Sequence, residues 1–197
     1  MLWRLQVARC ISILGHPLVF CPLAAWIALA SRTSGAQVLP LALEFFALLA
    51  LGVMLYSWLQ VRRGRWGHVD ASLPRERRSL NGLLLAALSV SALVVWFQPH
   101  ARGLALGITL SCFLIGAALL TARWLKVSLH VAFLVFASTV LWQVSLALVA
   151  GALVFTAAVG WSRLELGRHS LAEVLVGGGL GLVAGGVFWF VVLQIWG

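Results

Sequence analysis

The chain has 197 residues, of which 62% are hydrophobic and only 10% are charged. One soluble core of this length could not bury so much apolar surface, which excludes an ordinary globular domain. Fourteen Lys/Arg against five Asp/Glu give a net charge of +9. These basic residues lie between long apolar runs, which favours membrane orientation, anionic lipids or phosphates as the reason for the charge, and not nucleic acid.

Apolar runs of about the 20 residues needed to cross a bilayer follow one another along the chain. In order they cover residues 11–30, 38–61, 80–96, 104–122, 128–142, 144–161 and 170–196. The fifth and sixth separate at Trp142 and Gln143, because one helix over residues 127–161 would measure about 50 Å against a hydrocarbon core of about 30 Å. We therefore predict an all-α fold, a polytopic transmembrane bundle of six to seven helices that forms a single domain over residues 1–197.

The loops between these runs divide the charge unevenly between the two sides of the membrane. Alternation puts the N-terminus and the loops 62–79, 123–127 and 162–169 on one face. Of the fourteen Lys/Arg, only Arg32 and Arg102 fall on the other face. The positive-inside rule then places the basic face in the cytoplasm. Cations retained for chemistry would give the same count, which leaves the side of any active site open.

The first run also has features of a secretory signal peptide. Arg4 and Arg9 precede it, and it ends in the small-x-small sequence 28–30. Its length and the presence of His16 and Pro17 favour a retained helix instead. Cleavage would leave six helices with the same sidedness.

Two sets of small residues have a structural interpretation. Cys10, Cys21 and Cys112 show no paired spacing, which predicts neither a disulfide framework nor a thiolate metal site. The last run carries glycines at small-xxx-small spacings, which predict close helix packing. These glycines are Gly177, Gly178, Gly179, Gly181, Gly185 and Gly186.

Polar groups at the edge of a membrane span are costly and are the first candidates for function. The sharpest group is Arg163, His169 and Glu173. His169 and Glu173 are four residues apart at the start of the last run and share a helical face. The carboxylate can bind one ring nitrogen and make the other a better nucleophile, while Arg163 offers donors for phosphate oxygens. Alternatively, the His and Glu pair for solubility, and Arg163 and Arg168 are membrane anchors.

A second group lies at the start of the fifth run. Ser128 is a candidate N-cap, and the backbone N–H groups of such a helix end attract anions. His130 lies in the first turn and Lys126 just before it, an arrangement that suits a general acid beside a phosphate. A capped helix with an interfacial histidine is the alternative.

A third group is a run of arginines ahead of the third span. A headgroup-binding loop is the usual interpretation of such a run and covers Arg62, Arg63 and Arg65. For Arg77 and Arg78 we favour a role in phosphate binding, because the groups around His169 and His130 lie on the same basic face.

Together these groups resemble the motifs of the type 2 phosphatidic acid phosphatase superfamily. The third motif of that family reads Ser-Arg, five residues, His, three residues, Asp, and Ser162, Arg163, His169 and Glu173 reproduce it with Glu in the last place. The second motif, Pro-Ser-Gly-His, is matched at Ser128 and His130 but not at its Pro and Gly.

The first motif of the family, Lys, six residues, Arg-Pro, is the weakest match. Seven residues before Arg77 stands Asp70, and seven before Arg78 stands Ala71, and neither arginine precedes a proline. Lys126 is the candidate for the missing cation.

The resemblance implies hydrolysis of a phosphomonoester or diphosphate in two steps, with no metal and no cofactor. By similarity, His169 attacks phosphorus, Glu173 orients it, and His130 first protonates the leaving oxygen and then activates water. The phosphoryl oxygens would be held by Arg77 or Arg78, Lys126, Arg163 and the amides near Ser128. The implied substrate is a lipid phosphate, such as phosphatidate, or a polyprenyl phosphate or diphosphate, and the fold also serves transfer to acceptors other than water.

Two other classes of function remain open. A non-catalytic transporter or anionic-lipid-binding protein could use Glu44, in the middle of the second run, as an ion or proton site. Haem ligation would need histidines on adjacent helices. His130 and His169 are expected on one face, but His16 and His100 are expected elsewhere, which makes a bis-histidine arrangement poor.

Overall fold

The computed structural model describes residues 2–32, 35–69, 71 and 73–194, and these contain helices and no strand. The helices are α1 (Leu2–Leu14), α2 (Pro17–Ala30), α3 (Gly35–Arg62), α4 (Pro74–Trp96), α5 (Arg102–Thr121), α6 (Leu129–Val140), the 3-10 turn η1 (Leu141–Gln143), α7 (Leu146–Glu165) and α8 (Leu171–Gln194). The all-α class is confirmed. The end of the last expected run, including Trp196, lies outside the described residues.

Several of these helices have the length and composition to cross a bilayer. Within the described residues they are α3, α4, α5, α7 and α8, and the bent pair α1 and α2 adds a sixth if it forms one span. The segment Leu129–Gln143 is apolar but shorter. The elements from α2 to α8 follow the seven expected runs in order, whereas most of α1 precedes the first run and was not expected to be helical. They are compatible with a multi-pass membrane protein.

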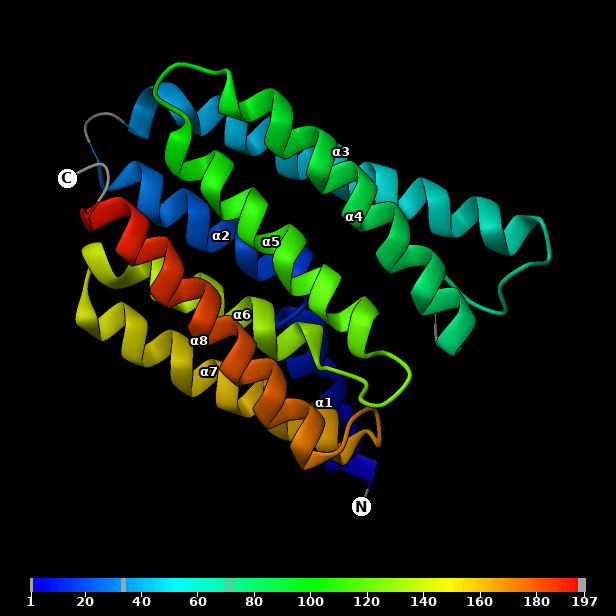
Figure 1. Cartoon of the computed structure of the whole chain (residues 1–197). Coiled ribbons are helices and arrows are strands. Elements are labelled where there is room, and N and C mark those ends of the chain that lie inside the picture. The colour runs from blue at the N-terminus through cyan, green and yellow to red at the C-terminus, as the bar shows by residue number, and fades with distance from the viewer. Residues whose placement is uncertain (1, 33–34, 70, 72, 195–197) are drawn as a thin grey trace.

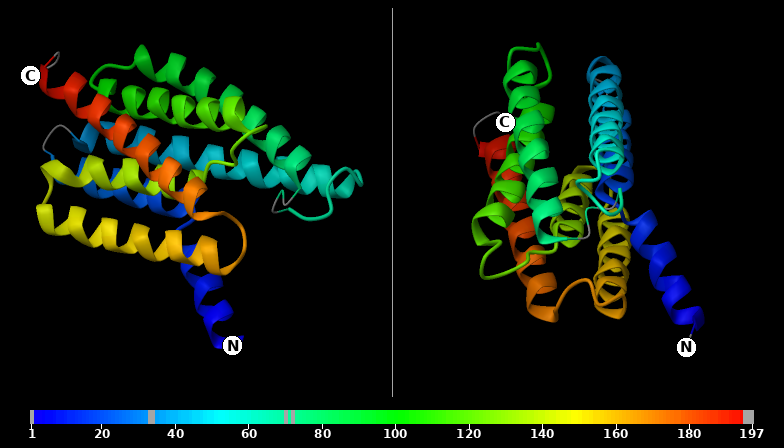
Figure 2. Two further views of the ribbon diagram at one scale, coloured as in Figure 1. Left: turned by 60° about the horizontal axis from the view of Figure 1, so that its bottom comes forward. Right: turned by 90° about the vertical axis from the view of Figure 1, so that its right-hand side faces the viewer.

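The helices form a bundle whose basic loops lie toward one end (Figure 1). The α5–α6 and α7–α8 loops, the end of α3 and the start of α4 lie toward the right of the view. The α4–α5 and α6–α7 connections, the end of α2 and the start of α3 lie at the other end. Helix α6 packs between α2, α7 and α8, whereas α3 packs chiefly on α2 and α4 on α5. Figure 2 shows α1 leaving the bundle at an angle.

The first expected run is not one continuous helix. It breaks between α1 and α2, whose axes differ by 50°. Proline lacks an N–H and disfavours helical geometry in the residue before it. His16, which precedes Pro17, is accordingly extended, with φ −68° and ψ 133°. The two helices therefore meet in an elbow at Gly15 and His16.

Two expected loops are shorter than the charge pattern suggested. Helix α4 begins at Pro74, so Arg75, Arg77 and Arg78 lie on its first turns and not in a loop. Proline is favourable at the first helical position. The buried Glu76 carboxylate accepts hydrogen bonds from the N–H groups of Leu73 and Gly67, both at 3.0 Å, which fixes the approach to the helix.

Helix α7 likewise continues past the expected boundary at residue 161 to Glu165 and carries Ser162 and Arg163 in its last turns. It ends before Gly167, whose φ of +61° is the left-handed conformation that favours glycine at a helix end.

Helices α6 and α8 approach each other along the glycines, as predicted. A Cβ on Gly177 would stand 2.6 Å from the carbonyl oxygen of Ser128. Cβ atoms on Gly181 and Gly185 would collide with Ala132 and Thr139 of α6. This close approach places the start of α8 directly beside the start of α6.

Candidate active site

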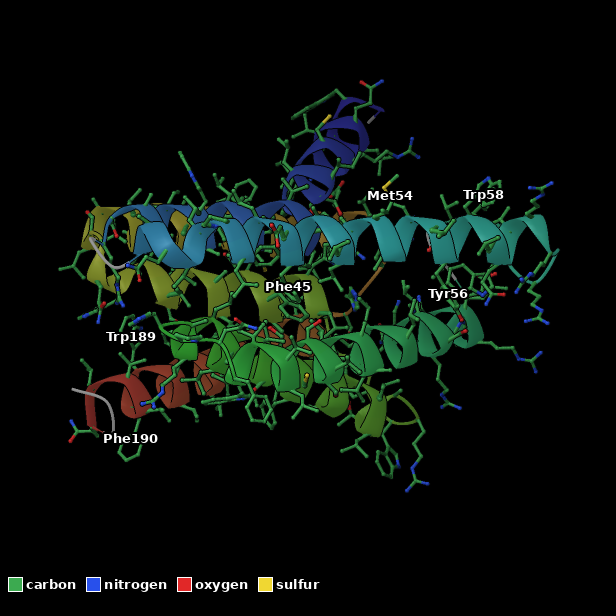
Figure 3. The ribbon with its side chains drawn as sticks, turned by 90° about the horizontal axis from the view of Figure 1, so that it is seen from above. Phe45, Met54, Tyr56, Trp58, Trp189 and Phe190 are labelled. Atoms are coloured by element: carbon green, nitrogen blue, oxygen red, sulfur yellow. The ribbon has the colours of Figure 1, made fainter. Side chains whose placement is uncertain are left out.

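A cavity of about 1560 Å³ connects the groups singled out in the sequence. At the basic end its wall includes Lys126, His130 and His169, and at the opposite end it includes Arg32 and His100. Between them it is mostly apolar and passes between α2 and α3 on one side and α4 and α5 on the other. Figure 3 shows Phe45 of α3 directed toward the α4–α5 side of this space.

His169 and Glu173 are held by the turn that joins α7 to α8. The N–H groups of Arg168 and His169 donate to the carbonyl of Arg163 at 3.0 and 3.3 Å. The N–H of Ser170 donates to Glu173 Oε2 at 3.0 Å, and the N–H of Glu173 donates to Ser170 Oγ at 3.3 Å. This reciprocal pair is a capping box, which fixes both the helix start and the carboxylate.

The surroundings of His169 select one tautomer of its ring. Its Nδ1 lies 3.1 Å from Glu173 Oε2 and 3.1 Å from the carbonyl oxygen of Lys126. Carboxylate and carbonyl oxygens both accept, so Nδ1 must carry the proton. In the neutral ring Nε2 then holds the lone pair.

The charge state of His169 follows from its burial. The side chain is only 7% exposed. Burial, followed by the charges of Lys126 and Arg163, lowers the pKa of His169 to about 4, and Glu173 opposes this only in part. The imidazole is therefore neutral at pH 7, with Nε2 available as a nucleophile.

Lys126 ties the two loops of the site together. Its ammonium donates to the carbonyl of Arg168, and its own carbonyl accepts from His169. Partial burial and then the charge of Arg77 lower the pKa of Lys126. Arg77 also interacts electrostatically with Arg168 and Glu173. Lys126 and Arg77 thus contribute positive charge to one place, although they come from different helices and loops.

Arg78 and Ser128 do not lie among the central groups of the site as Arg77 does. Arg78 is exposed at the cavity wall. Ser128 occupies the N-cap position of α6, as predicted, but its hydroxyl makes no capping bond. That hydroxyl is fully buried and has no hydrogen-bond partner among the described residues, and its side chain does not line the cavity. The N–H of Ser128 donates to the carbonyl of Glu173 at 3.1 Å, which joins the starts of α6 and α8.

No family model, curated protein or solved structure matches this chain. The interpretation of the site therefore depends on the residues themselves.

Two residues in and beside the elbow, His16 and Ser12, line the cavity, although the sequence pattern placed neither of them at the site. The ring of His16 meets that of His130 edge to face, with centroids 5.0 Å apart and an interplanar angle of 89°. Arg163 Nη1 donates to Ser12 Oγ at 2.8 Å. The expectation that His16 lies away from His130 was wrong, because the bend brings the start of α2 against α6. The signal available in the sequence was the His-Pro pair inside an apolar run.

The structure also bears on the alternative functions. Glu44 is exposed on α3 and is not part of the cavity wall. The rings of His16 and His130 are too close for a porphyrin to lie between them. Within the described residues, no group of three or more His, Cys, Asp or Glu is arranged to hold a metal ion.

Proposed function

We propose that this protein is a membrane phosphatase of the type 2 phosphatidic acid phosphatase kind, which hydrolyses a lipid phosphate or isoprenoid (di)phosphate through a phosphohistidine. One observation carries the proposal. His169 is neutral, its Nδ1 proton is held by two acceptors, and it lies in the wall of a cavity that also contains Lys126, His130 and Arg163.

In the first step, His169 Nε2 attacks the phosphorus atom and the bond from phosphorus to the leaving oxygen breaks. The proton needed by the leaving oxygen comes from His130. The ring of His169 becomes a cation when its nitrogen is phosphorylated, and the Glu173 carboxylate at Nδ1 stabilises that charge.

In the second step, His130, now neutral, takes a proton from a water molecule whose oxygen attacks phosphorus. The P–N bond breaks, inorganic phosphate is released and His169 returns to its neutral form. The proton taken from water replaces the one that His130 gave to the leaving oxygen in the first step. The same residue serves as acid and then as base, as microscopic reversibility of the two steps allows.

The cations of the site stabilise the phosphoryl group in both steps. Phosphoryl transfer depends mainly on positioning and on stabilising charge at the equatorial oxygens. Arg77, Lys126 and Arg163 supply this charge from α4, the α5–α6 loop and α7. Arg78, on the exposed rim, is a further candidate for the entering headgroup.

The shape of the cavity supports an amphiphilic substrate. Its basic end offers cations, and the stretch between that end and the opposite end at Arg32 and His100 is lined mostly by apolar side chains of α2 to α6. At about 1560 Å³ it exceeds the roughly 300–1000 Å³ of pockets for drug-sized molecules. A phosphate at the basic end with a hydrocarbon tail in the apolar part fits this division.

The test is phosphate release by purified protein in detergent, with EDTA present. The substrates are phosphatidate, a polyprenyl phosphate and a polyprenyl diphosphate. We expect wild type to release phosphate from at least one of them. His169→Ala should lose this activity, and His68→Ala should retain it because His68 is exposed and not part of the cavity wall. Undiminished activity in His169→Ala, or none in wild type, would contradict the proposal.

A further inference from the structure

Polar side chains in and beside the elbow between α1 and α2 line the same cavity, although they belong to none of the three motifs. Ser12 lies in the last turns of α1, and His16 is the N-cap of α2. They are four residues apart, and both line the cavity. A Cβ on Gly15 would collide with Val159 of α7, so the elbow is seated directly against that helix.

Ser12 contacts the arginine that follows Ser162 on α7. Its side chain is buried, and its Oγ accepts a hydrogen bond of 2.8 Å from Arg163 Nη1. A planar guanidinium presents its donors in a fixed fork, so a bond to one nitrogen sets the direction of the others. The hydroxyl of Ser12 therefore orients Arg163.

His16 contacts the histidine at the start of α6. Its Nδ1 accepts a hydrogen bond of 3.2 Å from the N–H of Leu18, which fixes the ring at the elbow. The ring of His130 then meets it edge to face at a centroid separation of 5.0 Å. Edge-to-face packing is directional, so a fixed His16 restricts the rotation of His130.

We propose that this elbow is a wall of the active site, in which His16 is a positioning residue for His130 and Ser12 is a positioning residue for Arg163. The inference rests on the proposed function. His130 must point at the leaving oxygen in the first step and at water in the second. A displacement of about 1 Å at a reacting group can cost about 100-fold in rate, which makes the orientation of its ring important.

The helix cap and the ring contact of His16 can be separated by substitution. His16→Asn keeps a good N-cap residue for Leu18 but removes the ring, whereas His16→Ala removes both. We expect kcat for an alkyl phosphate to fall at least about tenfold in both variants, with KM nearly unchanged. Only His16→Ala should also melt at a lower temperature.

The leaving group gives a second readout that a structural role would not change. Nitrophenolate departs without a proton, so formation of the phosphoenzyme from nitrophenyl phosphate does not need His130 as an acid. In His16→Asn this burst of nitrophenol should keep nearly the wild-type rate, while alkyl phosphate hydrolysis is slow. Equal losses with both esters, or a wild-type rate with the alkyl phosphate, would overturn the positioning role of His16.

Ser12 is tested separately, with inorganic phosphate as the probe. Ser12→Ala should weaken inhibition by phosphate several-fold, and Ser12→Thr, which keeps a hydroxyl, should restore it. Equal inhibition of Ser12→Ala and wild type would overturn the role of Ser12. Wild-type protein that hydrolyses neither ester defeats the proposed function and this inference with it. An active wild type beside unaltered elbow variants defeats this inference alone.

Discussion

The substitution Glu173→Gln isolates the charge of the carboxylate that contacts the proposed nucleophile. Gln has nearly the same shape, and its carbonyl oxygen can still accept from the N–H of Ser170 in the capping box. The hydrogen bond to His169 Nδ1, 3.1 Å long, loses its ionic character. The ground state contains a neutral ring and tolerates this, whereas the phosphorylated ring is a cation and does not.

The expected loss can be estimated from the geometry. Two unit charges about 4 Å apart interact by about 4 kcal/mol at an effective dielectric constant of about 20. Glu173 is 18% exposed, so solvent screening reduces this figure and about 2 kcal/mol is a reasonable value. With about 1.4 kcal/mol for each factor of ten, kcat should fall about 30-fold and at most about 1000-fold.

The pH dependence of kcat/KM in Glu173→Gln distinguishes loss of the carboxylate charge from damage to the fold. Glu173 raises the pKa of His169, so its removal lowers that pKa further below about 4. The ratio of variant to wild-type kcat/KM, in which ionisation of the substrate cancels, should therefore rise as the pH falls toward 4. Phosphate release between pH 4 and 8 measures it. An unchanged kcat would refute the role given to Glu173. So would a ratio of variant to wild-type kcat/KM that decreases as the pH is lowered from 6.5 to 4.

Further predictions concern the cations, the packing and the topology. Lys126→Met removes a charge that lowers the pKa of His169, so the acid limb of kcat/KM should move from about pH 4 toward 6.5 in the same assay. Arg77→Gln should reduce kcat/KM more than Arg78→Gln, because of these two arginines only Arg77 is close enough to Lys126 for its charge to lower the pKa of that lysine. Equal losses in the two variants would contradict this. Gly177→Ala should destabilise the bundle by about 1–3 kcal/mol, since its Cβ meets the Ser128 carbonyl, while Gly179→Ala, in open space, should melt like wild type in a thermal scan. In a cysteine-free background, Arg63→Cys and Gln98→Cys should react with an impermeant maleimide from opposite sides of sealed vesicles, and labelling from one side would overturn the arrangement of the loops.

The sequence predicted the elements of the bundle because each is marked by composition. A run of about 20 apolar residues specifies a membrane helix without reference to its neighbours. The pairing of His169 with Glu173 was also local, since residues four apart share a helical face. The glycines of α8 predicted close packing for a similar reason, although not the partner helix.

The contacts between distant segments could not be predicted in this way. In a membrane protein the side chains that face lipid and those that face another helix are both apolar, so periodicity does not identify the partner. The contacts of His16 with His130 and of Ser12 with Arg163 depend on a bend and on packing across more than 100 residues. The Ser128 hydroxyl, which has no hydrogen-bond partner among the described residues, is another such case. Helix α8 covers the start of α6, and its Glu173 carbonyl accepts the hydrogen bond from the N–H of Ser128.

The most direct test of the account is to trap the phosphoenzyme. Wild-type protein mixed with a radiolabelled phosphate ester and quenched in alkali should carry one phosphoryl group, stable in base and labile in acid, on the peptide that contains His169. His169→Gln should carry none. With nitrophenyl phosphate as the ester, whose leaving group needs no proton from His130, slowing the second step in His130→Ala should increase the label. Phosphate release without a covalent intermediate, or a label on another residue, would contradict His169 as the nucleophile.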